Sequence, residues 1–210
     1  MKLLNFDKVL CLSPHPDDVE YSMAGTIIKY QDTHFDILTM SGGGDFEGSD
    51  ADMRHKEIFK VWDSSGCQNY SLFLTKELKP KNNSQDKMIN VIENSYLNQD
   101  HDAIFVPTTM DSHFEHRLTN DLADSISRNK DISIIEYKTP STLNIWSANM
   151  YIDISKILDH KISMLGHFKS QQYHWYFEKD VIRHFHADFQ SYKKGYKYVE
   201  QYKIKQMYRL

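Results

Sequence analysis

Short apolar runs alternate along this chain with longer segments in which apolar residues recur at helical spacing. The first apolar run, residues 8–12, predicts a buried strand that ends at Ser13-Pro14. A helix is expected to begin at Asp17-Asp18 and to extend to Tyr30, because acidic residues suit a helix N-terminus. The chain therefore opens with a strand that leads directly into a helix.

The same alternation continues to about residue 154. It predicts strands at 35–40, 70–74, 103–107, 132–137 and 150–154, and helices at 50–64, 84–98, 115–128 and 155–171. Parallel neighbouring strands need a crossover connection, which is usually helical, so strands interleaved with helices predict a mostly parallel sheet covered on both faces. The expected fold class is α/β, a three-layer Rossmann-like fold.

The regular alternation fades after Pro140, and a tyrosine-rich region follows. No Gly/Ser/Pro-rich linker or repeat separates this region, and 210 residues is a usual length for one domain. We therefore expect a single domain over residues 1–210, in which residues 140–210 form a cap over the sheet.

The charge balance argues against polyanionic partners. A net charge of −4 and a pI near 6.2 provide no positive field for nucleic acid or an anionic membrane surface. No apolar run is long enough to span a bilayer, and the N-terminus lacks a signal-peptide pattern. Cys11 and Cys67 have no C-x-x-C spacing and are interpreted as buried thiols in a reducing compartment. We expect a cytoplasmic protein.

Residues suited to metal binding cluster after three predicted strands, at 14–18, 41–45 and 111–116. Ligands of open α/β sheets bind beyond the carboxyl ends of strands, where helix N-termini supply free backbone donors. The first segment places Asp17 and Asp18 side by side after His15. Such carboxylates repel each other unless a cation lies nearby, although a polar turn with an Asp N-cap would explain the pattern equally well.

His113 and His116 lie three residues apart in the third segment, so on a helix their rings would be neighbours on one face. Two histidines at this spacing can bind one ion or divide the work of a reaction, or they can simply lie on the surface. The first and third segments would face one crevice. A histidine, an aspartate and a histidine with an open position suit a catalytic zinc ion, which keeps three protein ligands and one water.

Two of these segments resemble the signature motifs of the PIG-L/LmbE-like family of zinc-dependent N-acetylglucosaminyl deacetylases. They are the His15-Pro16-Asp17-Asp18 turn and the Asp111-x-His113-x-x-His116 segment. The resemblance extends over essentially the whole chain: it also includes Arg54-x-x-Glu57, Tyr151-Ile152-Asp153-Ile154-Ser155 with Lys161, Ser170-Gln171, and residues 195–200 as the family's last helix.

The resemblance implies a reaction and a role for each site residue. The reaction is removal of the acetyl group from an N-acetylglucosamine-type substrate, and zinc would lower the pKa of a bound water and polarise the carbonyl. Fe²⁺ or another divalent ion is an alternative metal. The implied roles are metal binding by His15, Asp18 and His116, general-base catalysis by Asp17, oxyanion stabilisation or amine protonation by His113, and substrate binding by Arg54 and Asp111. For Asp111, orienting a ligand histidine or capping the following helix are equally open alternatives.

Two departures from the family pattern concern the substrate. Ser41-Gly42-Gly43-Gly44-Asp45 stands where the family commonly has G-E, and His113-Phe114-Glu115-His116 replaces its H-P-D-H form. Neither removes a ligand, but both would border the substrate. The alternatives are hydrolysis of another amide or carbamoyl substrate and a noncatalytic metal- or sugar-binding module. The expected partner is a small N-acetyl sugar conjugate, and a homo-oligomer is possible.

The remaining histidines and the tryptophans are not predicted to belong to the site. Trp62, Trp146 and Trp175 are interpreted as packing residues rather than as platforms for a sugar. His174 and the other histidines outside the two motifs are interpreted as structural or exposed.

Overall fold

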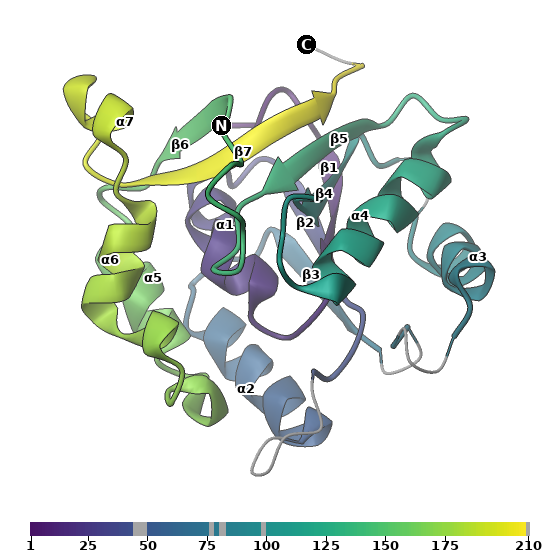
Figure 1. The fold of residues 1–210 in the computed structure, drawn as a ribbon, viewed down its shortest axis with the longest axis horizontal. Helices are drawn as coiled ribbons and strands as arrows, with labels where there is room; N and C mark the ends of the chain where they lie inside the picture. The colour runs from purple at the N-terminus through teal and green to yellow at the C-terminus, as the bar shows by residue number, and fades with distance from the viewer. Residues whose placement is uncertain (44–49, 76–77, 80–82, 98–99, 209–210) are drawn as a thin grey trace.

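The computed structural model describes residues 1–43, 50–75, 78–79, 83–97 and 100–208. Within this part of the chain, seven strands form one sheet in the order β3-β2-β1-β4-β5-β7-β6 (Figure 1). Strands β1 to β5 are parallel, and β7 runs antiparallel to both β5 and β6. The strands are β1 (Lys8–Ser13), β2 (His34–Thr39), β3 (Tyr70–Leu74), β4 (Ala103–Pro107), β5 (Ser133–Tyr137), β6 (Met150–Asp153) and β7 (Val199–Gln206).

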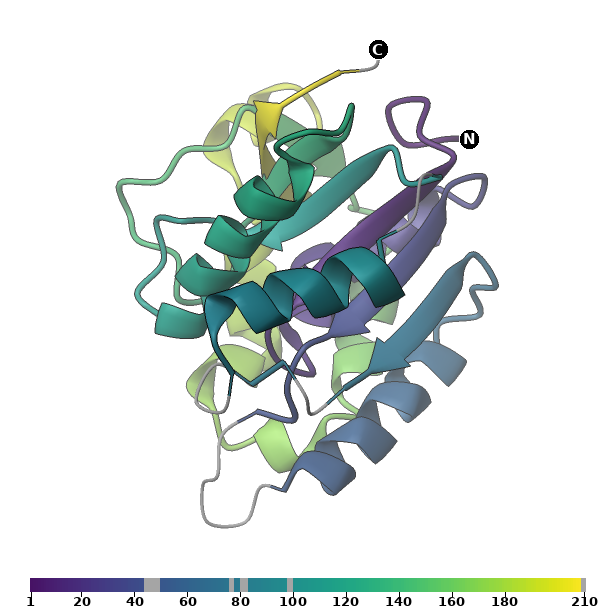
Figure 2. The same ribbon diagram turned by 90° about the vertical axis from the view of Figure 1, so that its right-hand side faces the viewer.

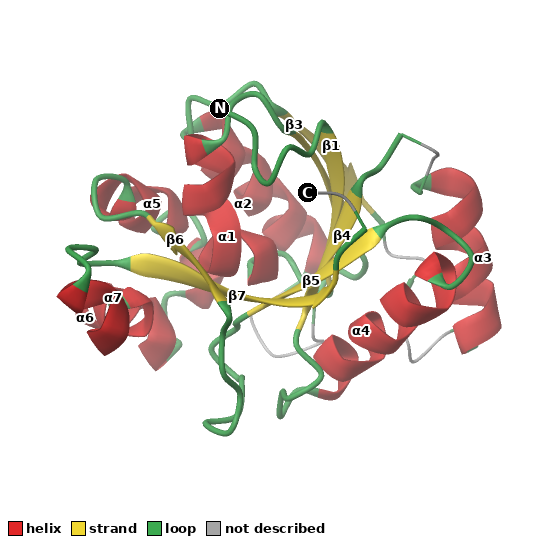
Figure 3. Cartoon of the chain, turned by 90° about the horizontal axis from the view of Figure 1, so that it is seen from above, coloured by secondary structure: helices red, strands yellow, loops and turns green. Residues whose placement is uncertain are grey.

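Helices cover both faces of this sheet (Figure 3). Figure 2 shows α3 and α4 together on one face, while α1, α2 and α5 lie on the other. The helices are α1 (Asp18–Lys29), α2 (Ala51–Asp63), α3 (Gln85–Ser95), α4 (Phe114–Ser127), α5 (Leu158–Leu165), α6 (Lys179–His186) and α7 (Phe189–Lys193), with short 3-10 helices η2 (Lys169–Gln171) and η3 (Trp175–Phe177). This arrangement confirms the predicted three-layer α/β fold with a mostly parallel sheet.

The core has two layers because successive side chains along each strand point to opposite faces of the sheet. Val9 and Cys11 of β1 pack with the cluster under α1, α2 and α5, whereas Leu10 and Leu12 pack with the cluster under α3 and α4. All four side chains are fully buried. A strand that is buried on both faces has apolar residues at consecutive positions, so the apolar run at residues 8–12 predicted β1 clearly.

The C-terminal region differs from the sequence-based expectation. Residues 195–200 were expected to belong to a helix, but Val199 begins β7, which pairs with β5 and β6 inside the sheet. Gly195 has φ +89°, a left-handed conformation that separates α7 from this strand. Residues 140–208 therefore extend the sheet as well as packing over it.

Two predicted helices also end earlier than expected. The helix predicted to reach Gln171 ends at Leu165, and Lys169–Gln171 forms the separate 3-10 helix η2. The predicted end of the third helix, Asn98, lies outside the described residues, and α3 ends at Ser95. Among the helices that the structure describes, none is long and apolar enough to cross a membrane.

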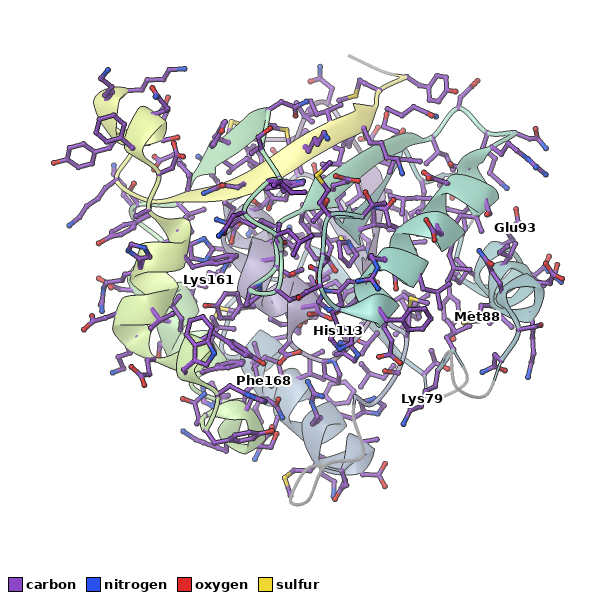
Figure 4. All side chains as sticks on the ribbon, viewed as in Figure 1. Lys79, Met88, Glu93, His113, Lys161 and Phe168 are labelled. Carbon is purple, nitrogen blue, oxygen red and sulfur yellow. The ribbon has the colours of Figure 1, made fainter. Side chains whose placement is uncertain are left out.

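A buried ion pair connects the C-terminal region to α1. Lys161 on α5 and Glu200 on β7 are both completely buried and form a salt bridge. Figure 4 shows Lys161 on the inner side of α5. The Glu200 carboxylate also accepts hydrogen bonds from the backbone N–H groups of Gly25 and Thr26 at 2.8 and 2.6 Å. The middle of α1 is thereby held against the last strand.

Candidate metal and substrate site

The predicted site residues meet at the carboxyl ends of β1 and β4. The turn after β1 carries the first motif into α1, and the loop after β4 carries the second motif into α4 (Figure 1). Both motifs open into one cavity of about 500 Å³. Its lining includes the predicted residues His15, Asp17, Asp18, Arg54, His113 and His116, together with Tyr21, Glu115, Pro140, Ser141, Gln171, Tyr173, His174, Trp175 and Tyr176.

Asp18 lies between the two histidines that were predicted as metal ligands. Its Oδ2 is 3.1 Å from Nδ1 of His15, and its Oδ1 is 3.2 Å from Nε2 of His116. All three side chains are buried. Ligand atoms around a tetrahedral zinc ion lie about 3.4 Å from one another. Each of these two N–O distances is therefore close to the spacing of ligands around such an ion.

A second carboxylate lies behind each of these histidines. Oδ2 of Asp111 is 3.1 Å from Nδ1 of His116, and Oε2 of Glu115 contacts Nε2 of His15. A carboxylate on the outer ring nitrogen fixes a proton there and directs the lone pair of the inner nitrogen toward the site. Asp111 is 1% exposed and is not among the cavity-lining residues, so it lies behind His116 rather than beside a substrate.

Glu115 was not among the predicted site residues. It lies one position before His116 on α4, but it contacts a histidine 100 positions earlier in the chain. Its place inside the second motif was the one signal in the sequence. Only the folded arrangement shows that its carboxylate reaches His15.

His113 occupies a different position from the other two histidines. It is the N-cap of α4, and its Nδ1 accepts a hydrogen bond from the backbone N–H of Glu115 at 3.3 Å. The neutral ring therefore carries its proton on Nε2. The ligand atoms of His15, His113 and His116 lie within 4.8 Å of one another, so the group could also hold a metal ion. Figure 4 shows His113 at the start of α4.

Asp17 occupies the N-cap position of α1, but its side chain makes no capping hydrogen bond. Its φ of 144° is strained for a residue with a side chain. Oδ1 of Asp17 accepts a hydrogen bond from Nη2 of Arg54 at 3.0 Å. Burial raises the pKa of Asp17 to about 6, although the positive charge of Arg54 lowers it. The carboxylate is thus held beside the cavity with a pKa close to neutrality.

Arg54 is buried in the site and is not the solvated residue that arginines in helices usually are. It lies on α2, and its Nη2 also donates to the carbonyl oxygen of Pro16 at 2.9 Å. Gly43 leaves room for it, because a Cβ at that position would lie 1.7 Å from Nη1 of Arg54. Gly44 and Asp45, which complete the predicted glycine segment, lie outside the described residues.

Protons on two histidines supply positive charge beside the carboxylates of the site. Burial lowers the pKa of His15, but hydrogen bonds to Asp18 and Glu115 outweigh this effect and raise it to about 9. Burial also lowers the pKa of His116, which Asp18 and Asp111 raise to about 10. In the protein alone, two imidazolium charges therefore compensate the carboxylates. A divalent cation supplies the same charge at the same place.

The wall opposite the two motifs comes from the C-terminal region and was missed by the sequence analysis. Residues 171–176 contribute five side chains to the cavity. Glu57 on α2 holds the start of this segment, because its carboxylate accepts hydrogen bonds from N and Oγ of Ser170 at 2.9 and 2.7 Å. The Tyr21 hydroxyl holds its end by donating to the carbonyl oxygen of Tyr176 at 2.8 Å.

Two side chains of this wall differ from their predicted roles. Trp62 and Trp146 are buried, as expected for packing residues, but Trp175 is 66% exposed and lines the cavity. His174 also lines the cavity. Neither residue has a motif around it that would have placed it there.

Solved structures of deacetylases and of a hydratase share this fold. N,N'-diacetylchitobiose deacetylase from Pyrococcus horikoshii is similar with a TM-score of 0.71 and 23% identity, covering 96% of this chain and 85% of that one. The zinc-inhibited form of a teicoplanin deacetylase gives 0.68 and 13%, covering 93% and 96%. The 4-carboxy-2-hydroxymuconate hydratase of Pseudomonas putida gives 0.69 and 16%, covering 97% and 95%. At these identities the likeness establishes the fold and leaves the reaction open.

The sequence itself matches a family. No curated protein gives a significant match over the chain. The family profile described as PIG-L, GlcNAc-PI de-N-acetylase, matches residues 10–127, which is more than half of the chain and includes both motifs of the site. The resemblance seen in the sequence is thereby confirmed, and the chain belongs to the PIG-L family.

Proposed function

We propose that this protein is a metal-dependent hydrolase that removes the acetyl group from an N-acetylglucosamine-type substrate. The observation that carries the proposal is the arrangement around Asp18: His15 and His116 approach its two oxygens at 3.1 and 3.2 Å, while the neighbouring Asp17 points elsewhere, to Arg54. This arrangement supports metal binding by Asp18 and proton transfer by Asp17. Membership of the PIG-L family supports the same reaction.

His15, Asp18 and His116 would hold the ion, which we propose to be zinc. The donor set of two imidazoles and one carboxylate is usual for zinc, although Fe²⁺ suits such ligands too. When bound, the ion supplies Lewis-acid polarisation of the amide carbonyl and a lowered pKa for water. His113 is the alternative third ligand, but its Nδ1 accepts the N–H of Glu115, so Nε2 carries a proton instead of a free lone pair.

The protein's own groups would move the protons. Asp17, with a pKa raised to about 6, takes a proton from the attacking water, and Arg54 holds its carboxylate in place. The Nε2–H of His113 then donates a hydrogen bond to the oxyanion, and the protonated Asp17 gives its proton to the departing amine. Asp111 was assigned to the substrate on the family resemblance; its burial behind His116 favours a positioning role instead.

The test is release of acetate. Purified protein is incubated with N-acetylglucosamine conjugates in the presence of zinc, with and without a chelator, and free acetate is measured. We expect release that the chelator abolishes and that added zinc restores. Release of another acyl group, such as carbamoyl, in place of acetate would favour the broader amide hydrolase. Tight sugar binding without release of any acyl group would favour a binding module and overturn the proposal.

The role assignment has its own test. We expect Asp17→Asn to keep the bound metal and to lose turnover, whereas Asp18→Asn should lose both. Metal content by elemental analysis separates the two cases. Equal loss of metal from both variants would contradict the assignment of metal binding to Asp18 and proton transfer to Asp17.

A further inference from the structure

Three aromatic side chains of one short segment line the cavity: Tyr173, Trp175 and Tyr176, hereafter the aromatic lip. Tyr173 and Trp175 are each 66% exposed, whereas Tyr176 is half-buried. The ring of Trp175 meets the ring of Tyr176 edge-on, with centroids 5.9 Å apart. Large aromatic rings exposed beside a cavity are unusual, because burying them elsewhere would stabilise the fold.

The backbone that carries these rings is fixed. Glu57 binds Ser170 just before the lip, and the Tyr21 hydroxyl donates to the carbonyl oxygen of Tyr176 within it. His174 stacks on Tyr176 with ring planes 13° apart. The rings are therefore exposed on an ordered scaffold, and little backbone entropy is lost when a ligand binds them.

The lip runs from the interior of the cavity to its mouth. Tyr176 meets the ring of the buried Tyr21 on α1 edge-on, with centroids 5.9 Å apart, so it is the inner ring of the lip. The two more exposed rings, Tyr173 and Trp175, lie farther out. A ligand whose amide reaches Asp17 would thus fill the interior, and anything attached to it would pass over the exposed rings.

The charge of the cavity lining indicates which chemical groups could be attached to the N-acetyl sugar. Arg54 is the only lysine or arginine among the described residues that line the cavity, and its guanidinium is bonded to Asp17. A phosphate group at the mouth would therefore meet no other lysine or arginine of the described lining. A pyranose ring, which is uncharged and has an apolar face of C–H groups, suits an aromatic surface. A cavity of about 500 Å³ also lies in the range that encloses ligands larger than one hexosamine.

We propose that Tyr173 and Trp175 form a subsite for a second, uncharged sugar ring, attached to the N-acetyl sugar that the metal site would hold. The proposal rests on the deacetylase function proposed above. It identifies the substrate as a neutral oligosaccharide or disaccharide conjugate, in preference to a free monosaccharide or a sugar phosphate.

The binding test uses the chain's own tryptophans. Of the three in the sequence, Trp62 is 1% exposed, Trp146 is 8% exposed and Trp175 is 66% exposed, so acrylamide quenching of fluorescence reports mainly on Trp175. Full-length Asp17→Asn protein, loaded with zinc, is titrated with N,N'-diacetylchitobiose, N-acetylglucosamine or N-acetylglucosamine 1-phosphate. We expect the disaccharide to reduce the quenching constant severalfold and the two single-ring ligands to leave it unchanged. Equal protection by all three, or protection by none, would overturn the subsite.

The kinetic test uses Trp175→Ala and Tyr173→Ala, with Trp175→Phe as the conservative variant. Phe189→Ala is the matched control, since Phe189 on α7 is 74% exposed and is not among the residues lining the cavity. An aromatic contact of about 0.5–1.5 kcal/mol corresponds to a loss of up to about tenfold in kcat/KM. We expect this loss for the disaccharide in the two alanine variants, a change below about twofold for the monosaccharide, partial recovery in Trp175→Phe, and no change in the control.

The outcomes separate this proposal from the proposed function. Equal losses for monosaccharide and disaccharide would overturn the subsite while leaving the deacetylase intact. Protection of Trp175 by the disaccharide without any acetate release would support the subsite and count against the deacetylase. Acetate release without protection of Trp175 would support the deacetylase and overturn the subsite.

Discussion

Two groups of buried charges lie against the same helix, α1, and they differ in how their charges are satisfied. At the middle of the helix, the Glu200 carboxylate is enclosed by Lys161, two backbone N–H groups and the hydroxyls of Thr26 and Tyr202. Every one of these partners belongs to the protein. The group is closed, and Lys161 and Glu200 are completely buried.

At the start of the helix, the charges face a cavity instead. Asp18 is shared by His15 and His116, and the pKa values of both histidines are raised, to about 9 and about 10. The compensating charge here consists of protons that a cation can replace. Burial alone therefore does not identify a functional site. A better indication is a group of buried charges that faces a cavity and whose compensating protons a cation can replace.

The largest expected effect concerns the open group. Asp17→Asn should reduce kcat by about 10² to 10⁴-fold, because a positioned general base contributes about that much. The fold should be retained, since Asp17 makes no capping hydrogen bond to α1 and the amide oxygen of Asn can still accept a hydrogen bond from Arg54. Steady-state kinetics and thermal unfolding measure the two quantities. Loss of the fold would show that the Arg54–Asp17 contact is structural.

A substitution in the closed group should reduce the stability of the fold and leave the metal site unchanged. Lys161→Met leaves Glu200 buried without its cation, which should reduce the free energy of unfolding by about 3–5 kcal/mol. Metal affinity should remain unchanged. The matched control is Lys130→Met, which removes a half-exposed ion pair to Glu93 and should change stability by less than about 1 kcal/mol. Denaturant unfolding of both variants checks the difference, and equal effects would contradict it.

The two carboxylates behind the histidines test whether the open group is built around a metal. Glu115→Gln and Asp111→Asn should each weaken metal binding by about 10 to 100-fold, because they orient the rings of His15 and His116. Metal-buffered titration measures the affinity. Glu93→Gln, on the surface of α3, serves as the control. Unchanged affinity in both variants would argue that the carboxylates serve only the fold.

The smallest effect is the pH dependence of the wild-type protein. A base acts as its carboxylate, and the pKa of Asp17 is raised to about 6, so kcat/KM should fall about tenfold per unit as pH decreases below that value. A bound cation would lower the pKa of Asp17, which places the midpoint at about 6 or below. The residual activity of Asp17→Asn should lack this acid limb. A midpoint well above 6 would assign the limb to another group.

The elements that build the open group could be predicted from the sequence, whereas the closed group could not. His15 and Asp18 follow a strand whose apolar run is unmistakable, and His116 lies in a motif after another such strand. The closed group depends on β7, whose first two residues were expected to belong to a helix. Lys161 and Glu200 are 39 positions apart and give no local pattern that connects them.

The sequence by itself determined the α/β alternation, the family and the residues of the two motifs, because strand and helix periodicity and motif spacing are local properties of the chain. Only the tertiary structure decided that Glu115 reaches His15, that Arg54 holds Asp17, and that Trp175 stands exposed at the cavity mouth. These contacts join segments far apart in the chain. Side-chain burial and charge pairing arise from packing between such segments, so no window of the sequence contains them.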